Sequence, residues 1–339
     1  MLSFAAAALK ANLITDVPGI SVGHAEDARI GSGVTALIFD QPAVASVAIH
    51  GGAPGLRDTA LLEPEMTVER VDALVLSGGS AFGLDAMGGV AAYLRAIGRG
   101  FAIRDVRVPI VPGAVLFDLL NGGDKNWGAK PAYWDIGYRA AANAKQEFPL
   151  GSVGAGLGAT TANLKGGIGS ASAVTSSGYI VGALIAVNAL GQATIGDGPH
   201  FWASSHEVGR EFGGLGWPSG RTDEARAFRI KGDDPENTTI GIVATDAYLT
   251  KAQAKRLALV AQDGLAMALH PAHAALDGDT IFAAATGTAL DPPSLRDLTE
   301  LGAVAAGCVA RAIARAIYEA TPLPFEGSLP SWRQKFGTR

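Results

Sequence analysis

The chain has 339 residues, enough for one large domain or two smaller ones; 48% of them are hydrophobic, whereas only 17% are charged. Its 27 Lys and Arg against 32 Asp and Glu give a net charge of -5, which argues against a nucleic-acid partner because such proteins carry a basic surface. The single Cys308 rules out an internal disulfide and a cysteine-rich metal site, and apolar runs such as residues 179–187 are far shorter than the ~20 residues of a membrane span. We therefore expect a folded protein without a transmembrane helix, in the cytoplasm or, as the alternative, in the periplasm.

Short runs of β-branched residues alternate with helical patterns in the first half of the chain. Residues 34–39, 44–49 and 71–76 are each closed by Gly or Pro, and they predict three buried strands. Apolar residues then recur at helical spacing through residues 84–97. This spacing predicts a helix, with Ser80 as its N-cap.

Small residues dominate between positions 151 and 196, where the pattern changes to strands joined by tight turns. Residues 179–187 predict a strand that follows a turn at 176–178. Residues 221–237 are mostly polar and predict a surface loop. Loops of this length are usually functional or act as linkers.

An apolar strand pattern begins abruptly where this loop ends. It covers residues 238–245 and is followed by a helix from Thr250, a strand at 280–285 and helical patterns over 294–319. Cys308 falls within the last of these, where we expect it to be a small buried hydrophobe.

Several motifs with known chemistry are incomplete or absent. Segment 154–159 matches a loose G-x-G-x-x-A dinucleotide pattern, but the residues after it do not open a helix, which disfavours a dehydrogenase. The spacing around Ser80 does not fit the G-x-S-x-G elbow of hydrolases, and the sequence contains no P-loop. Among the six histidines, only the loosely spaced His270 and His273 approach a zinc-binding pair, so we expect no metal site.

Two features that precede strands could carry hydrolytic chemistry. Asp277 and Asp279 share one tight turn, where they can cap the turn, hold a cation or act as acid and base. Thr238 follows Asn237 at the junction of a polar loop and a buried strand. Self-cleaving hydrolases create an N-terminal nucleophile at such junctions, and its own α-amine, with a pKa of about 7.7, takes the hydroxyl proton. From these residues alone, an ordinary turn and an ordinary strand-starting Thr are the simpler interpretations.

Five segments give a more specific indication, because together they resemble one family in the same order along the chain. They are residues 14–24, residues 51–57, Gly78-Gly-Ser-Ala-Phe-Gly-Leu-Asp85, Lys165-Gly-Gly-Ile-Gly169 and Asn237-Thr-Thr-Ile-Gly-Ile-Val-Ala-Thr-Asp246. The family is that of the self-processing N-terminal nucleophile peptidases, which includes the L-aminopeptidase/D-esterase, the β-peptidyl aminopeptidases and the nylon-oligomer hydrolases. The resemblance covers nearly the whole chain.

The resemblance implies that the bond between Asn237 and Thr238 is cut by the protein itself. A single catalytic domain, 1–339, would then consist of a large chain, 1–237, and a small chain, 238–339. Thr238 matches the freed nucleophile, and the Asn-Thr-Thr junction is more similar to the nylon-oligomer hydrolases than to the aminopeptidases, which use Ser. Asp277 and Asp279 match the acidic pair that orients the amine and hydroxyl of this residue.

Two further positions match the family's catalytic residues, and two others could line the substrate pocket. Asn188 matches an Asn whose amide donates to the oxyanion, and Lys165 matches a lysine near the nucleophile that favours the free amine. Phe117 stands where the nylon-type enzymes carry Tyr, so nylon-oligomer activity is not to be assumed. Trp127, and less specifically the region near residues 201–202, could also line the pocket.

For the fold, the resemblance implies an α+β protein, an αββα sandwich of the type shared by these peptidases and the ornithine acetyltransferases. It implies an amide or peptide hydrolase without metal or organic cofactor, acting on a small amide or peptide as a homotetramer of cleaved heterodimers. An acyltransferase of the ornithine-acetyltransferase type and a non-catalytic binding protein on the same scaffold are the alternatives.

Overall fold

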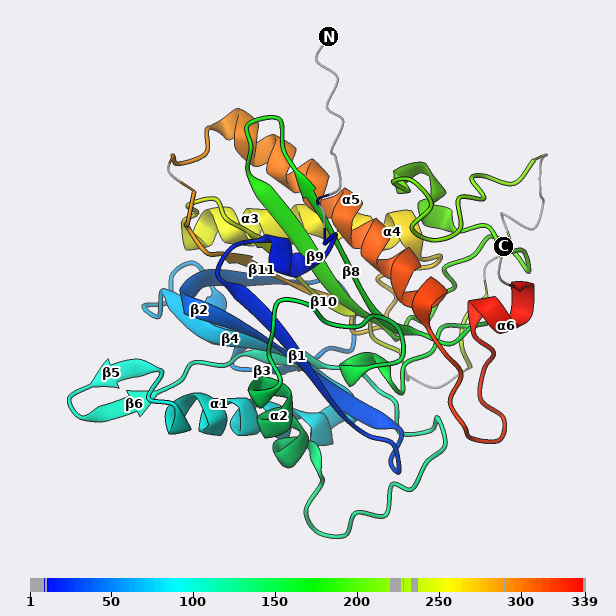
Figure 1. Ribbon diagram of the computed structural model, residues 1–339, viewed down its shortest axis with the longest axis horizontal. Helices are drawn as coiled ribbons and strands as arrows, with labels where there is room; N and C mark the ends of the chain where they lie inside the picture. The colour runs from blue at the N-terminus through cyan, green and yellow to red at the C-terminus, as the bar shows by residue number, and fades with distance from the viewer. Residues whose placement is uncertain are drawn as a thin grey trace.

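The computed structural model describes residues 9, 11–219, 227, 229–232, 237–289 and 291–337, so most of the expected loop at 221–237 lies outside the described residues. Nine strands pair in the order β3-β7-β4-β2-β11-β10-β9-β8, with β1 added beside β2, and helices cover both outer faces (Figure 1). The expected αββα architecture is confirmed.

Strand β2 (Ser32–Ile49) belongs to both layers of the sandwich. Its first part pairs with β1 (Ile20–Asp27) and β4 (Arg70–Ser77), and its last six residues pair with β11 (Thr280–Ala285). The register with β4 shifts between Ile38 and Ala43, and the three residues at the shift are exposed. The expectation of two separate strands at 34–39 and 44–49 is therefore wrong. Pro42 lies in this irregularity, where a missing N–H costs no ladder bond.

The predicted strands at 71–76, 179–187, 238–245 and 280–285 correspond to β4, β9, β10 and β11, whereas β1, β3, β5, β6 and β7 were not predicted. The turn at 176–178 joins β8 (Gly167–Val174) to β9 (Ile180–Val187) in an antiparallel pair, while β10 (Ile240–Thr245) runs antiparallel to β9 and parallel to β11. At the other end of the order lie β7 (Gly113–Val115) and β3 (Gly55–Arg57), and β5 (Phe101–Ile103) and β6 (Val106–Val108) form a separate hairpin that projects from the body (Figure 1).

Three of the helices, including α6 (Trp332–Phe336), begin after a residue whose side chain caps them. Thr250 caps α3 (Lys251–Ala261) and Ser294 caps α5 (Leu295–Glu319), each by accepting the N–H three residues on, as the sequence predicts for both starts. The other helices are α1 (Ala86–Ala96), α2 (Tyr133–Ala142) and α4 (Asp263–Ala268).

Ser80 is not an N-cap, contrary to expectation. It lies in a 3-10 turn, Ser80–Asp85, that separates β4 from α1, and its φ of 50° is in the left-handed region. A serine in this conformation does not present its hydroxyl to the N–H groups of α1.

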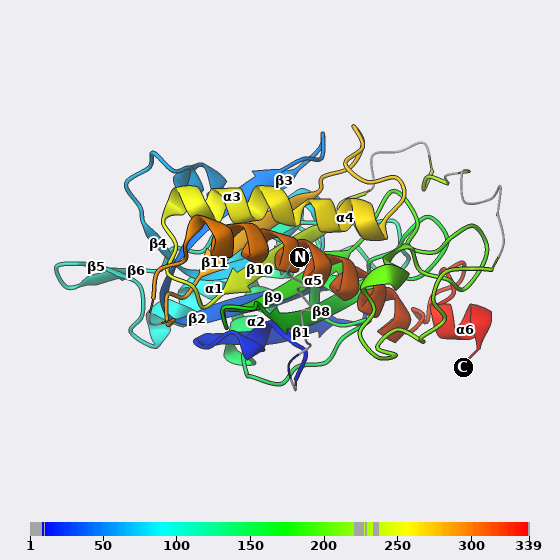
Figure 2. The same ribbon diagram turned by 90° about the horizontal axis from the view of Figure 1, so that it is seen from above.

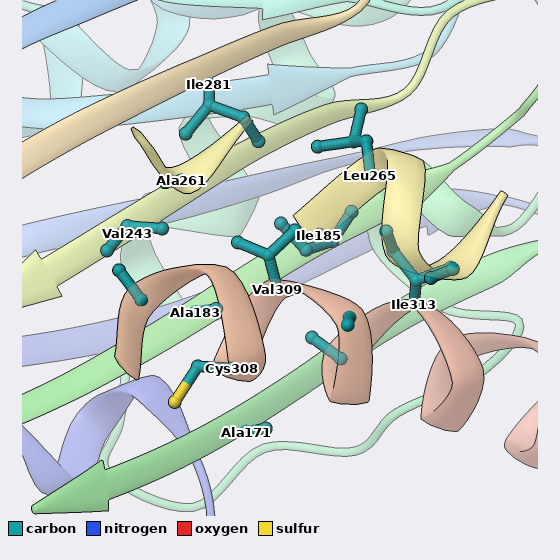
Figure 3. Packing of buried hydrophobic residues seen from close by; sticks show 14 of the residues in the cluster. Ala171, Ala183, Ile185, Val243, Ala261, Leu265, Ile281, Cys308, Val309 and Ile313 are labelled. Atoms are coloured by element: carbon teal, nitrogen blue, oxygen red, sulfur yellow. The ribbon is translucent and has the colours of Figure 1, made fainter. Parts of the chain in front are cut away.

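Three layers of apolar contacts hold the sandwich together. One lies between the two sheet layers, and one lies between α1 and α2 and the sheet half formed around β2 and β4. In the third, α3, α4 and α5 lie across the sheet (Figure 2), and Figure 3 shows Val309 of α5 beside Ile185 of β9, with Cys308 and Ile313 on neighbouring turns of the helix. Cys308 is buried, as expected.

Helix α5 is also long and apolar enough to cross a membrane, judged by length and composition alone, with a mean hydropathy of 1.4. An unbroken apolar run was the sequence criterion for a membrane span, and this helix, in which charged residues interrupt the apolar ones, was therefore not singled out. In the structure, 78% of that stretch is buried inside the protein.

Strands from both sides of position 238 interleave in one sheet. β10 and β11, which follow Thr238, lie between β2 and β9, which precede it. A break in the chain at this position would leave the two pieces joined through ladder hydrogen bonds on both flanks and through the layer between the sheets.

Candidate active site

At one end of four neighbouring strands, β9 finishes and β8, β10 and β11 begin. The predicted site residues lie at these strand termini. Lys165 lies just before β8, Asn188 just after β9, Thr238 just before β10 and Asp279 just before β11. The strand directions and pairings place these four positions side by side in that order. Because neighbouring strands are about 4.8 Å apart, the acidic turn lies one strand from Thr238, and Lys165 lies two strands away, roughly 10 Å.

The main chain around Thr238 is held from both sides. Its N–H donates to the carbonyl oxygen of Asn188 at 2.9 Å, and its hydroxyl donates to the carbonyl oxygen of Asn237. The same Asn237 oxygen accepts the N–H of Gly278 at 3.1 Å. The carbonyl that precedes Thr238 is therefore in contact with the threonine hydroxyl and with a backbone donor at the same time.

The turn at 277–279 is buried and tied to its neighbours, so it is more than a surface turn. Asp279 accepts the N–H of Thr239 at 3.1 Å through Oδ1 and the N–H of His273 at 2.8 Å through Oδ2, and the His273 ring Nδ1 lies 3.1 Å from the same Oδ2. Burial lowers the pKa of His273, but its interactions with Asp279 outweigh burial, and the net pKa is raised. These contacts join the starts of β10 and β11.

Gly278 permits the close approach of this turn to Thr238. A Cβ at position 278 would lie 2.6 Å from the Thr238 Oγ1 and 2.8 Å from the carbonyl oxygen of Ala53. On one side of this glycine, burial and then the adjacent carboxylate of Asp279 raise the pKa of Asp277 to about 8. Burial beside a second carboxylate therefore favours the protonated form of Asp277.

Asn188 is oriented by contacts at both ends of its amide. Its Nδ2 donates to the carbonyl oxygen of Phe117 at 2.9 Å, while its Oδ1 accepts the N–H of Thr160 at 3.0 Å and the Lys231 Nζ at 3.2 Å. Its backbone carbonyl holds the N–H of Thr238. Asn188, which the resemblance to the family assigns to the site, thus lies next to Thr238 in the structure.

Lys165 is fully buried and does not point at the nucleophile. Its Nζ donates to the carbonyl oxygens of Gly156, Ala159 and Gly166 at 2.9, 2.7 and 2.8 Å, which accounts for all three donors of an ammonium group. Burial lowers its pKa to about 7, although Asp118 opposes that shift. Lys165 fixes the loop that contains the glycines of segment 154–159. This segment forms a short 3-10 turn and opens no helix, so the dinucleotide-site alternative has no structural basis.

Two cavities meet at Phe117. One, of about 410 Å³, is lined by Asn237 and Thr238, and the other, of about 190 Å³, is lined by Lys165 and Thr160; Phe117 lines both. Phe117 thus forms part of the wall of the candidate site.

The other suggested pocket residues lie elsewhere. Trp127 does not line the Thr238 cavity; its ring lies 5.5 Å from that of Phe82 and 5.9 Å from that of Tyr133. Phe201 is buried in the helix-covered core, and Trp202 packs near Trp217.

Two residues of the site were not assigned to it from the sequence. Ser80 lines the Thr238 cavity, and its left-handed backbone conformation carries no sequence signal that separates it from a helix cap. The other is His273, whose N–H and ring Nδ1 contact Asp279; its position shortly before the acidic turn is the sequence signal that could have identified it.

Comparison with known proteins supplies the family context. A family model described as Peptidase family S58 matches residues 12–328. The chain is 41% identical to an uncharacterized aminopeptidase of Mycobacterium tuberculosis, over 96% of this chain and 98% of that protein. It is also 26% identical to a 6-aminohexanoate-oligomer endohydrolase of Paenarthrobacter ureafaciens, over 87% of this chain and 81% of that protein.

A solved structure supports the fold. The L-aminopeptidase D-Ala-esterase/amidase of Ochrobactrum anthropi, described as a variant of the Ntn hydrolase fold, is similar with a TM-score of 0.71 at 20% identity. The match covers 99% of this chain and 97% of that one. The backbone arrangement is thus shared over the full length.

Proposed function

The chain belongs to peptidase family S58 and is a hydrolase of amide bonds, and from this premise we propose that it cuts itself between Asn237 and Thr238 and then uses Thr238 as its nucleophile. The observation that carries the proposal is the contact of the Thr238 hydroxyl with the Asn237 carbonyl group. A nucleophile in this position is already beside the bond that it would break.

In the self-cleavage step, the Thr238 Oγ1 attacks the Asn237 carbonyl carbon. The Gly278 N–H, 3.1 Å from that carbonyl oxygen, is placed to stabilise the negative charge that develops on it. The C–N bond then breaks, and the hydroxyl proton ends on the Thr238 nitrogen. Water hydrolyses the resulting ester, which leaves a carboxylate on Asn237 and a free hydroxyl and amine on Thr238.

In turnover, the new amine acts as the general base for the Thr238 hydroxyl. An α-amine has a pKa of about 7.7, so a large share is unprotonated near neutral pH. The hydroxyl attacks the substrate carbonyl, the leaving amine takes a proton, and water releases the acyl group from Thr238. The buried turn of Asp277 and Asp279, one strand away, gives the cationic form of the amine an acidic partner.

Asn188 and Lys165 act at different distances from the reacting atoms. The Asn188 amide, anchored on the Phe117 carbonyl and the Thr160 N–H, is placed to support the oxyanion of the substrate. Lys165 is a positioning residue. It binds the Ala159 carbonyl directly before Thr160, so it acts on the reaction through Asn188.

Ester turnover by three forms of the protein tests this proposal. With p-nitrophenyl butyrate, we expect a burst of p-nitrophenol from the wild type and a butyryl adduct on the peptide that begins at Thr238. Thr238→Ser should keep both signals, and Thr238→Ala should lose both. Undiminished turnover by Thr238→Ala would refute the assigned nucleophile, whereas an adduct on another residue would move the site.

A further inference from the structure

The ring of His273 faces an oxygen atom with each of its two nitrogen atoms. Its Nδ1 makes an ion-pair contact of 3.1 Å with the Asp279 Oδ2, and its Nε2 lies 3.3 Å from the main-chain carbonyl oxygen of Gln262. A carbonyl or carboxylate oxygen can only accept a hydrogen bond, and a neutral imidazole carries only one N–H. Both contacts are therefore attractive at the same time only when the ring is a doubly protonated imidazolium.

The main chain and the neighbours of His273 hold this ring in place. Its N–H donates to the same Asp279 Oδ2 at 2.8 Å, and its φ of 56° is in the left-handed region. The His50 ring packs edge-on against it, with the ring centroids 5.2 Å apart, and Asp263 at the start of α4 adds a more distant negative charge. Among these described neighbours, Asp279 makes the direct ionic contact, and its side chain is fully buried.

Asp279 connects this histidine to the residue that follows the proposed nucleophile. Its Oδ1 accepts the N–H of Thr239 at 3.1 Å. On its other side lies Asp277, whose pKa is raised to about 8 by burial, by the charge of Asp279 and by a hydrogen bond between the two carboxyl groups. A proton held by Asp277 in that bond leaves the negative charge on Asp279, where the donors of Thr239 and His273 stabilise it.

We propose that His273 is a positioning residue whose imidazolium form keeps the negative charge of the acidic pair on Asp279 and so holds the start of β10 for self-cleavage. This inference rests on the proposed function, because it assumes that the chain cuts itself before Thr238. His273 acts through Asp279 and the Thr239 N–H rather than by touching the reacting atoms. When the ring loses the Nδ1 proton and keeps the Nε2–H on the Gln262 carbonyl group, a lone pair faces the carboxylate and the contact becomes repulsive.

A histidine NMR titration of the uncut Thr238→Ala chain tests the charge of the ring. With ring-labelled histidine, the signals of His273 and His50 are assigned from their loss in His273→Asn and His50→Asn. We expect His273 to titrate at higher pH than His50, because burial lowers the pKa of both rings but only His273 has the direct Asp279 contact, which raises its pKa overall. Asp279→Asn should move the His273 titration to lower pH. A His273 ring that titrates below His50 would overturn the inference.

The rate of self-cleavage tests the role of that charge. His273→Asn keeps a side-chain N–H donor and a residue type that tolerates a left-handed backbone, but it removes the charge. In the full-length chain the Thr238 nitrogen is an amide, so no α-amine contributes to the pH dependence. We expect the wild type to cleave itself about 10-fold faster than His273→Asn at pH 6, where the ring is protonated, and within about 2-fold of it at pH 9, where the ring has lost its proton.

The ratio of the two rates separates a charge effect from a structural one, because it cancels the pH effects that both proteins share. His50→Asn is the matched control, since it removes the neighbouring ring but not the Asp279 contact, and it should cleave at the wild-type rate at both pH values. A His273→Asn defect of the same size at pH 6 and pH 9, or no defect at all, would overturn the inference. A wild type that never cleaves would instead overturn the proposed function, and the titration of the uncut chain would still decide the charge of His273.

Discussion

Gly278→Ala tests whether the distance between the 277–279 turn and Thr238 controls reactivity. A new methyl group at position 278 would lie 2.6 Å from the Thr238 Oγ1 and 2.8 Å from the Ala53 carbonyl oxygen. Ordinary carbon–oxygen contacts begin at about 3.3 Å, so the turn must move away from the Thr238 Oγ1 by roughly 0.7 Å and from the Ala53 oxygen by roughly 0.5 Å. Because the Ala53 oxygen belongs to the backbone, part of this shift falls on the nucleophile.

The expected result is slow self-cleavage in a protein that still folds. A displacement of about 1 Å can cost on the order of 100-fold in rate, and overpacking typically costs about 1–3 kcal/mol of stability. The assay follows conversion of newly purified full-length protein into fragments on denaturing gels, with thermal denaturation measured in parallel. Gly198→Ala is the matched control, because its new Cβ would meet no atom closer than 3.4 Å. Cleavage of Gly278→Ala at the wild-type rate would refute the geometric argument.

Three further variants test separate parts of the account. At alkaline pH the Lys165 amine is neutral and keeps two N–H donors for its buried carbonyl partners, so their loss in Lys165→Met should lower the free energy of unfolding by about 2 kcal/mol. Because burial lowers the Lys165 pKa from 10.5 to about 7, the unfolded chain binds more protons between these values. Wild-type stability should therefore gain up to about 5 kcal/mol relative to Lys165→Met as pH rises from 7 to 10.5, and parallel pH profiles would contradict this. Asp277→Asn mimics a protonated carboxyl and should cleave itself within about 10-fold of the wild-type rate. Asp279→Asn turns one acceptor into a donor that faces an N–H group, so it should lower the free energy of unfolding in urea by about 1–3 kcal/mol. Equal cleavage rates and equal stabilities of the two variants would show that the roles of Asp277 and Asp279 are not distinct. Glu211→Ala leaves Arg311 buried without its 2.6 Å partner and should lower stability by about 3–5 kcal/mol without slowing self-cleavage, so a cleavage defect in the folded variant would indicate coupling to the site.

The strand ends explain why so much of the site could be predicted. Thr238 and Asp279 each stand directly before an apolar run, and parallel neighbouring strands place such residues together. The spacing of apolar residues alone predicts the two strands that follow Thr238 and Asp279, but it does not predict that these strands pair with each other. The αββα arrangement and the roles of Asn188 and Lys165 came from the resemblance to the family, because strand order depends on contacts between distant segments.

The differences between the predicted and the observed structure arise where a local sequence pattern competes with tertiary contacts. Pro42 indicates a strand end, yet β2 continues past it because the register shift leaves this position without a ladder bond. Ser80 has the composition of a helix cap but occupies a left-handed turn at the cavity wall. Trp127 lies near the pocket motifs in sequence, but it packs on Phe82 and Tyr133 instead.

The most direct test of the central claim is the intact mass of the purified protein beside Thr238→Ala. We predict that the wild type yields two fragments of about 24 and 10 kDa, in proportion to chain length, and that the smaller one begins at Thr238. Thr238→Ala should remain a single chain of 34.5 kDa. A wild-type protein that stays uncut after prolonged incubation, or a Thr238→Ala variant that is cut at the same bond, would contradict self-processing by Thr238.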